Sequence, residues 1–181
     1  VSYYDPARNQ VKRFENEKDS AGTFTSYTAW SAYTSREGVL WISTLHGLLF
    51  RVNPAQGSIP FYPTPDRGAT SIYTDENNYL WIGTDQSGII QKDPAGRTVN
   101  TFKYNPQDKS GISSNDIVCI RGDREGNVWV GTYGNGLNRF EKQTGRFHPF
   151  RYDTSKRKSF NRDVVLTVYQ DPTDAEVIWI G

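Results

Sequence analysis

The chain has 181 residues, and its 21 Lys and Arg against 20 Asp and Glu leave a formal net charge of +1. This length is enough to bury a hydrophobic core. The sequence contains no run of 18 apolar residues, which is the pattern that would predict a transmembrane helix. The balanced charge, without a basic block to follow a phosphate backbone, argues against nucleic-acid binding. The single cysteine, Cys119, excludes an intrachain disulfide. It lies in a β-rich run, where we expect it to be a small buried apolar side chain.

Short strands centred on tryptophan recur along the chain at intervals of about 40 to 50 residues. These strands are Leu40-Trp41-Ile42, Leu80-Trp81-Ile82, Val128-Trp129-Val130 and Ile178-Trp179-Ile180. In each of the first three units a Thr follows the Trp by three residues, and a later strand ends in a Phe. Self-similarity of this period, with four short strands in each unit, is typical of the blades of a β-propeller. The constant phase of the tryptophans favours packing between blades over a ladder for sugar stacking.

We therefore predict an all-β chain, a β-propeller fragment with three complete four-stranded blades and two half blades. The predicted complete blades are 15–62, 63–104 and 105–152, and the half blades are 1–14 and 153–181. We expect the chain to be a piece of a larger ring. The alternative is a closed four-bladed ring, in which the N-terminal strands complete the C-terminal half blade. Either arrangement hides sheet edges that would otherwise pair with other chains.

The stretch from Gly111 to Phe140 carries the most complete unit, with Ile112-Ser113-Ser114-Asn115 leading to Asp123, Gly126 and Trp129. This unit resembles the two-component regulator propeller repeat, and the resemblance covers essentially the whole chain. It implies the periplasmic sensor region of a membrane-bound histidine kinase, often a hybrid kinase that detects breakdown products of polysaccharides. The partners that it implies are an oligosaccharide, the remainder of the propeller with its kinase, and a second copy in a homodimer.

The residues that are typical of metal sites have simpler interpretations here. Asp75, Asp123 and Asp171 each open a hairpin turn, and no calcium-loop pattern of alternating acidic residues surrounds them. His46 and His148 are the only histidines, and their spacing does not match a metal site. We therefore predict no metal site, no cofactor and no catalytic residue.

A ligand is expected where loops converge around the central channel. In a four-stranded blade, the turn between strands two and three lies on the same face as the crossover into the next blade. The residues predicted to bind a ligand on that face are Tyr133, Asn135, Asp85, Gln86, His46, Asn115, Arg162 and Arg67. Tyr133 would stack on a sugar ring, and Gln86, Asn135 and Asn115 would form hydrogen bonds with its hydroxyl groups. The two arginines would add charge-assisted contacts to an acidic sugar.

The leading hypothesis is a non-catalytic sensor whose ligand binding is relayed to a kinase outside this chain. A propeller enzyme, either a lyase or a glycan hydrolase, is the first alternative. A hydrolase needs two carboxylates roughly 5–10 Å apart, and the acids predicted on the ligand-binding face are Asp85, Asp66, Asp116 and Asp163. The second alternative is a scaffold that binds protein partners without a small ligand.

Overall fold

The structure is a computed structural model that describes residues 2–5, 9–13, 29–35, 38–44, 48–52, 61–63, 68–151, 153, 155 and 163–181. All regular elements in these ranges are β-strands, as the sequence predicts. None of the described segments forms a helix long and apolar enough to span a membrane.

The strands form three antiparallel four-stranded sheets and two hairpins. Sheet 1 consists of β3 (Ala29–Thr34), β4 (Leu40–Thr44), β5 (Leu48–Val52) and β6 (Phe61–Pro63). Sheet 2 consists of β7 (Ala69–Thr74), β8 (Leu80–Thr84), β9 (Ile89–Lys92) and β10 (Thr98–Phe102). Sheet 3 consists of β11 (Ile117–Gly122), β12 (Val128–Thr132), β13 (Leu137–Glu141) and β14 (Arg146–Phe150). The N-terminal hairpin pairs β1 (Ser2–Asp5) with β2 (Gln10–Arg13), and the C-terminal hairpin pairs β15 (Val168–Gln170) with β16 (Ile178–Ile180).

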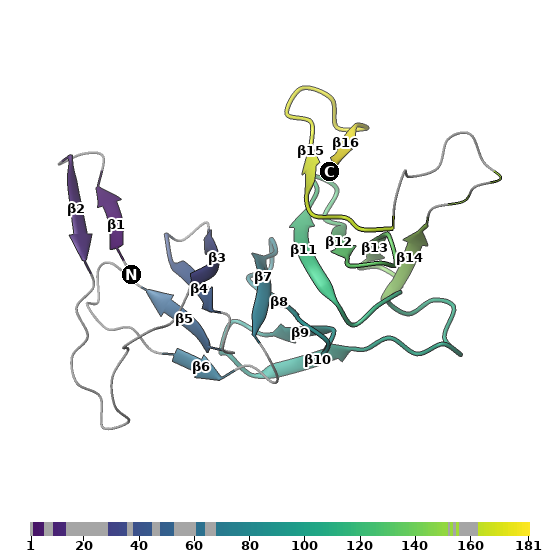
Figure 1. The fold of residues 1–181 in the computed structure, drawn as a ribbon, viewed down its shortest axis with the longest axis horizontal. Coiled ribbons are helices and arrows are strands. Elements are labelled where there is room, and N and C mark those ends of the chain that lie inside the picture. Colours follow the sequence, from purple (N-terminus) through teal and green to yellow (C-terminus); the bar gives the residue numbers. More distant parts are fainter. Residues whose placement is uncertain are drawn as a thin grey trace.

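The sheets follow one another in chain order, from the purple N-terminal hairpin to the yellow C-terminal hairpin (Figure 1). Within each sheet the strands are paired in sequence order, so every connection is a simple hairpin. The first strand of each sheet contacts the first strand of the next, because β7 lies against β3 and β11, and β11 lies against β15. First strands that adjoin in this way are typical of a propeller, in which they surround the central axis. The predicted propeller fragment is confirmed.

A β-bulge recurs near the start of the first strand in all three sheets. The register shifts between Ala29 and Ser31, between Ala69 and Ser71, and between Ile117 and Cys119. In sheet 2 the bulged Thr70 donates its hydroxyl proton to the carbonyl oxygen of Ile117 at 2.6 Å. Bulges bend a strand and redirect a side chain, and here the redirected hydroxyl connects sheet 2 to sheet 3.

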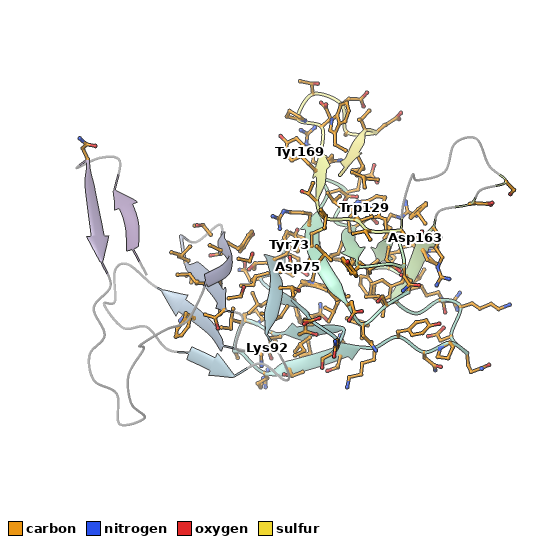
Figure 2. The ribbon with its side chains drawn as sticks, in the orientation of Figure 1. Tyr73, Asp75, Lys92, Trp129, Asp163 and Tyr169 are labelled. Atoms are coloured by element: carbon orange, nitrogen blue, oxygen red, sulfur yellow. The ribbon has the colours of Figure 1, made fainter. Side chains whose placement is uncertain are left out.

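The largest cluster of buried apolar side chains lies between sheets 2 and 3, with Trp81 at its centre. The indole ring of Trp81 stacks on Phe102, with ring centroids 5.6 Å apart, and meets the ring of Phe140 edge-on at 5.1 Å. Phe147 extends the cluster from β14 through its contact with Phe102 at 5.3 Å. Tyr73, labelled in Figure 2, packs against the edge of this cluster. Aromatic pairs in these geometries stabilise a core by more than their buried area alone.

Smaller clusters fill the other two spaces between neighbouring sheets. Leu49 of sheet 1 packs against a group of apolar side chains from sheet 2, with Trp41 at the edge of the cluster. Cys119 and Leu137 of sheet 3 pack against Val165 and Val168, which lie before and within the C-terminal hairpin. Cys119 is buried, as predicted, and burial raises the pKa of its thiol. Sheets 2 and 3 therefore each pack one face on the preceding sheet and the other face on the following element.

An aspartate at the turn between the first two strands holds both the turn and the tryptophan. In sheet 2, Oδ1 of Asp75 accepts hydrogen bonds from the backbone N–H groups of Asn77 and Tyr79, both at 3.0 Å. Its Oδ2 accepts the indole N–H of Trp81 at 3.0 Å. The indole N–H of Trp129 donates in the same way to Asp123 at 2.8 Å, and that of Trp179 to Asp171 at 2.9 Å. We call this arrangement the Asp–Trp link, and it supports the interpretation of these aspartates as turn residues.

How deeply each repeated tryptophan is buried depends on whether a neighbouring sheet packs against it. Trp81 is fully buried, and Trp41 and Trp129 are half-buried against their clusters. Trp179 is 59% exposed, because within the described residues no further sheet packs on the C-terminal hairpin. Packing of this tryptophan between blades stays a prediction.

We expect Trp81→Ala to destabilise the fold by about 3–5 kcal/mol, the usual range for deleting a fully buried aromatic side chain. The matched control is Trp179→Ala, which removes an exposed indole with the same hydrogen bond to an aspartate. Chemical denaturation of the two variants measures both losses. Equal losses would contradict the central place of Trp81 in the core.

We expect Asp75→Asn to destabilise the chain by roughly 1.5–3 kcal/mol, the range for hydrogen bonds to a buried charged group. The amide oxygen can still accept from the turn, but the amide NH₂ cannot accept the indole N–H of Trp81. Asp171→Asn breaks the equivalent bond at an exposed tryptophan, so its loss should be smaller. Thermal unfolding of both variants tests this order, and a larger effect at Asp171 would contradict it.

Candidate functional site

The predicted ligand-binding residues that the structure describes lie at the end of the sheets that carries the turns β8–β9 and β12–β13 and the crossover between sheets 2 and 3. We call this end the crossover face. In both turns a threonine closes the loop, because the backbone N–H and the hydroxyl of Thr84 donate to the carbonyl oxygen of Gly88 at 3.0 and 2.8 Å. Thr132 makes the same two bonds to Gly136 at 3.1 and 2.7 Å. Thr84 and Thr132, each three residues after a tryptophan, are therefore turn residues.

The crossover between sheets 2 and 3 brings the two turns together. The carbonyl oxygen of Asn115 accepts the N–H of Gly88 at 3.0 Å, and that of Asp116 accepts the N–H of Tyr133 at 3.0 Å. Asp163 extends the series, since its carbonyl oxygen accepts the N–H groups of Gly134 and Gly136 at 3.0 and 2.7 Å. The structure thus places Asp85, Gln86, Asn115, Tyr133 and Asn135 on one face, linked through backbone hydrogen bonds.

A buried polar network, which the sequence analysis did not identify, supports this crossover. Asn138 is fully buried, and its Oδ1 accepts the N–H of Ser113 at 3.0 Å while its Nδ2 donates to the Ser113 hydroxyl at 2.8 Å. The Ser113 hydroxyl donates in turn to the carbonyl oxygen of Asn135 at 2.9 Å. Buried networks with every member satisfied specify one arrangement. The paired serines at 113 and 114 in the repeat were the available signal.

The predicted residues differ in how free their side chains are. Tyr133 is 65% exposed and Gln86 is also exposed, whereas Asp85, Asn115 and Asn135 are half-buried. The side-chain oxygen of Asn115 accepts the N–H of Tyr104 at 2.7 Å, so that atom has a structural role. His46, Arg67 and Arg162 lie outside the described residues, and their part in the site remains a prediction.

Gln86 stands out by its backbone, which has a φ of 81°, in the left-handed region. The equivalent position in the next turn is Gly134, with a φ of 94°. A residue with a side chain costs roughly 1–2 kcal/mol in this conformation. Such local strain is found at binding sites more often than elsewhere, and here it holds an exposed amide on the crossover face.

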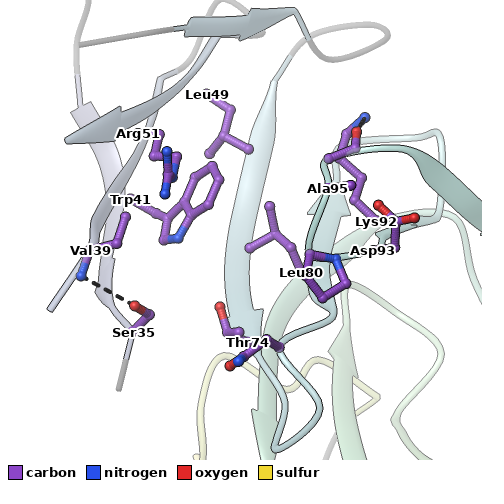
Figure 3. A pocket seen from close by; sticks show the side chains of 13 residues that line it. Ser35, Val39, Trp41, Leu49, Arg51, Thr74, Leu80, Lys92, Asp93 and Ala95 are labelled. Atoms are coloured by element: carbon purple, nitrogen blue, oxygen red, sulfur yellow. Dashed lines mark hydrogen bonds between the residues drawn. The ribbon is translucent and has the colours of Figure 1, made fainter. Parts of the chain in front are cut away.

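The opposite end of the sheets carries two cavities, and we call this end the hairpin face. One cavity of about 260 Å³ lies between sheets 1 and 2, with Trp41, Arg51 and Lys92 among its lining residues (Figure 3). A more open groove of about 540 Å³ lies between sheets 2 and 3 and is lined by Glu76, Glu125 and other polar side chains. The sequence analysis did not predict either cavity. Among the described residues, no three His, Cys, Asp or Glu side chains come together as metal ligands.

A sequence model of the family described as "SMP-30/Gluconolactonase/LRE-like region" matches residues 29–168. No curated protein matches the chain by sequence.

The solved structures that resemble this fold include two extracellular domains and an enzyme. One is the extracellular domain of BT4673 from B. thetaiotaomicron, a protein described as a one-component or hybrid two-component system. It is 20% identical to this chain, with a TM-score of 0.75. The match covers 99% of this chain and 23% of that one. The extracellular domain of the hybrid two-component system BT3049, from the same organism, is 21% identical with a TM-score of 0.69, over 84% of this chain and 22% of that one. A virginiamycin B lyase from Staphylococcus aureus is 16% identical with a TM-score of 0.65, over 87% of this chain and 50% of that one. At these identities the matches establish a shared propeller fold, and this chain spans less than a quarter of either extracellular domain.

Two glycines of the turn β12–β13 allow a test of how tightly the crossover face is built. Gly134→Ala should cost about 1–2 kcal/mol for its left-handed backbone alone, because open space surrounds the position of the added Cβ. Gly136→Ala should cost more, because its φ is also positive and the Cβ would lie 2.2 Å from the carbonyl oxygen of Phe150. Chemical denaturation compares the variants, and equal losses would show that the turn can move away from β14.

Proposed function

We propose that this chain, which belongs to the SMP-30/Gluconolactonase/LRE-like region family, is part of a non-catalytic ligand-sensing propeller in a two-component signal-transduction sensor. The fold shared with the extracellular domains of BT4673 and BT3049 supports this proposal. By the same analogy, the chain functions in the periplasm as part of the ectodomain of an inner-membrane protein. The histidine kinase that receives the signal lies outside this chain, and ligand binding could act through a homodimer.

The observation that carries the proposal is the exposed Tyr133 on an ordered turn. Its backbone N–H is held by Asp116, and the following glycines are held by Asp163, while its ring is 65% exposed. Sister turns carry Leu45 and Asp85 at this position, so the position is not needed for packing. An aromatic ring on a rigid turn suits stacking on a sugar, and the neighbouring Asn135 and Gln86 suit hydrogen bonds with hydroxyl groups. We therefore propose an oligosaccharide as the ligand.

A propeller enzyme is the second candidate, and it is favoured by the fold shared with virginiamycin B lyase. The crossover face carries Asp85, Asp116 and Asp163, all half-buried. If one of these carboxylates is catalytic, its change to an amide abolishes turnover of a bound ligand while binding remains. A sensor binds the same ligand and leaves it unchanged, so product analysis after prolonged incubation separates the two candidates.

We expect Tyr133→Ala to weaken ligand binding by about thirtyfold, which corresponds to about 2 kcal/mol for a stacking aromatic at the centre of a site. The ligand is first selected on an array of neutral and acidic oligosaccharides and is then titrated calorimetrically. The matched control is Tyr169→Ala, which removes an equally exposed tyrosine, 58% accessible, from the C-terminal hairpin. Equal affinities for the wild-type and Tyr133→Ala proteins would exclude Tyr133 from the site. The absence of any array ligand would favour the protein-binding scaffold.

A further inference from the structure

The repeats allow the two sheet-to-sheet spaces at the hairpin face to be compared position by position. Lys92 lies opposite Leu80 in sheet 2, as Phe140 lies opposite Val128 in sheet 3. Lys92 therefore occupies the position of Phe140, the ring that covers Trp81. Thr98 lies opposite Lys92, where sheet 3 has Phe147. Two aromatic side chains of the cluster around Trp81 are thus replaced, between sheets 1 and 2, by a lysine and a threonine.

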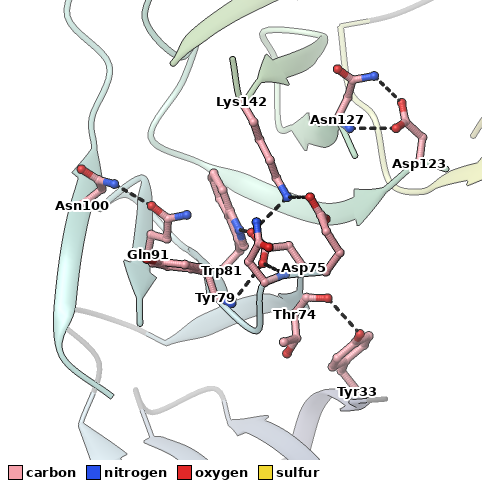
Figure 4. Close-up of polar contacts among 12 residues, drawn as sticks. Tyr33, Thr74, Asp75, Tyr79, Trp81, Gln91, Asn100, Asp123, Asn127 and Lys142 are labelled. Carbon is pink, nitrogen blue, oxygen red and sulfur yellow. Dashed lines mark hydrogen bonds and ion pairs between the residues drawn. The ribbon is translucent and has the colours of Figure 1, made fainter. Parts of the chain in front are cut away.

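Two further replacements open the same space. Between sheets 2 and 3, Lys142 of the β13–β14 turn forms ion pairs with Asp75 at 3.2 Å and with Glu76 at 2.6 Å (Figure 4). Pro94 occupies the position of Lys142 in sheet 2, and Ser35 occupies the position of Asp75 in sheet 1. The hydroxyl of Ser35 accepts the N–H of Val39 at 3.2 Å, so the turn itself is kept. The space next to Trp41 is left as the cavity of about 260 Å³.

The described residues that line the cavity include two cations and one carboxylate. Arg51 and Trp41 are paired across β4 and β5 and approach the cavity from sheet 1, while Lys92 approaches from sheet 2 (Figure 3). Lys92 donates only to neutral acceptors, the hydroxyl of Thr98 at 3.1 Å and the carbonyl oxygen of Gly96 at 3.4 Å. In the described part of the chain, Arg51 forms no ion pair.

The single carboxylate among the described lining residues is already engaged. Oδ2 of Asp93 accepts from the guanidinium group of Arg97 at 2.7 Å, and Oδ1 accepts the backbone N–H of Arg97 at 2.9 Å. The backbone hydrogen bond from Arg97, followed by the bond from its side chain, lowers the pKa of Asp93. Asp93 therefore stays ionised and paired with Arg97, and the charges of Arg51 and Lys92 remain available to an anion.

Apolar side chains form part of the remaining wall, since Leu49, Leu80 and Trp41 line the cavity. The volume lies just below the roughly 300–1,000 Å³ of sites for drug-sized molecules, so it suits a single ring.

From these observations we propose that the cavity between sheets 1 and 2 is a binding site for a small carboxylate carried on a six-membered ring, either a sugar acid or an aromatic acid. The ring lies on the indole of Trp41, and the carboxylate accepts charge-assisted hydrogen bonds from Lys92 and Arg51. This site is separate from the crossover face and does not depend on the proposed sensor role.

The test is calorimetric titration of the full chain with four probes: D-glucuronate, benzoate, D-glucose and acetate. We expect at least one ring carboxylate to bind at least tenfold more tightly than both glucose, which has no charge, and acetate, which has no ring. Tighter binding of glucuronate identifies the site as one for sugar acids, and tighter binding of benzoate as one for aromatic acids. If neither ring carboxylate exceeds the two reference probes, the proposal is wrong.

Two variants locate the binding by making sheets 1 and 2 resemble the next pair. Lys92→Phe installs the residue that stands at position 140, and Arg51→Gln installs the residue that faces Trp81 at position 91. Each should weaken binding of the ring carboxylate by tenfold or more, and if Lys92→Phe fails to fold, Arg51→Gln decides alone. Arg139→Gln, at the same repeat position in sheet 3, and Tyr169→Ala, on the C-terminal hairpin, should bind as the wild type does. Full binding in Arg51→Gln would place the carboxylate outside this cavity and overturn the proposal.

Discussion

The shared carboxylate of the Asp–Trp link is the interaction on which the rest of the structure depends. One oxygen holds the backbone of a tight turn, and the other holds the indole N–H of the following strand. A buried indole N–H without an acceptor would be costly, so the carboxylate makes it possible to place a tryptophan at the junction of two sheets. Because the tryptophan then covers the next sheet, one local interaction both closes a hairpin and orients neighbouring sheets.

The interfaces between sheets use one plan with different side chains. Between sheets 2 and 3, aromatic rings surround Trp81, which is completely buried, and Lys142 forms an ion pair with Asp75. Between sheets 1 and 2, Lys92 and Ser35 stand at equivalent positions, and Trp41 borders a cavity. The pairing of β4 with β5 in sheet 1 has the same register as the pairing of β8 with β9 in sheet 2. A propeller can therefore gain a charged cavity through a few substitutions while its backbone hydrogen bonds are preserved.

At the crossover face, hydrogen bonds fix the backbone of the turns, whereas several side chains point into solvent. The interfaces between sheets differ, because side chains form them. Carbonyl oxygens of Asn115, Asp116 and Asp163 accept the N–H groups of the neighbouring turns. Side chains at these turns, Tyr133 above all, are then available to a ligand. Loops that are rigid in their backbone and variable in their side chains suit recognition. This division supports a binding role for the crossover face, and it leaves the hairpin face to contribute a second, chemically distinct site.

The sequence alone determined the repeat, the strand that carries each tryptophan, the turn role of the aspartates and the face that carries Tyr133. These features are local, because residues a few positions apart make the turns and the period-2 strands. Only the tertiary structure decided that Trp81 is buried while Trp179 is exposed, that Ser113 binds Asn138, and that Lys92 borders a cavity beside Trp41. These depend on which side chain a neighbouring sheet presents at the point of contact. The repeat alone shows that Lys92 stands at the position of Phe140. Only the packing of sheet 1 against sheet 2 shows that Lys92 then borders a cavity.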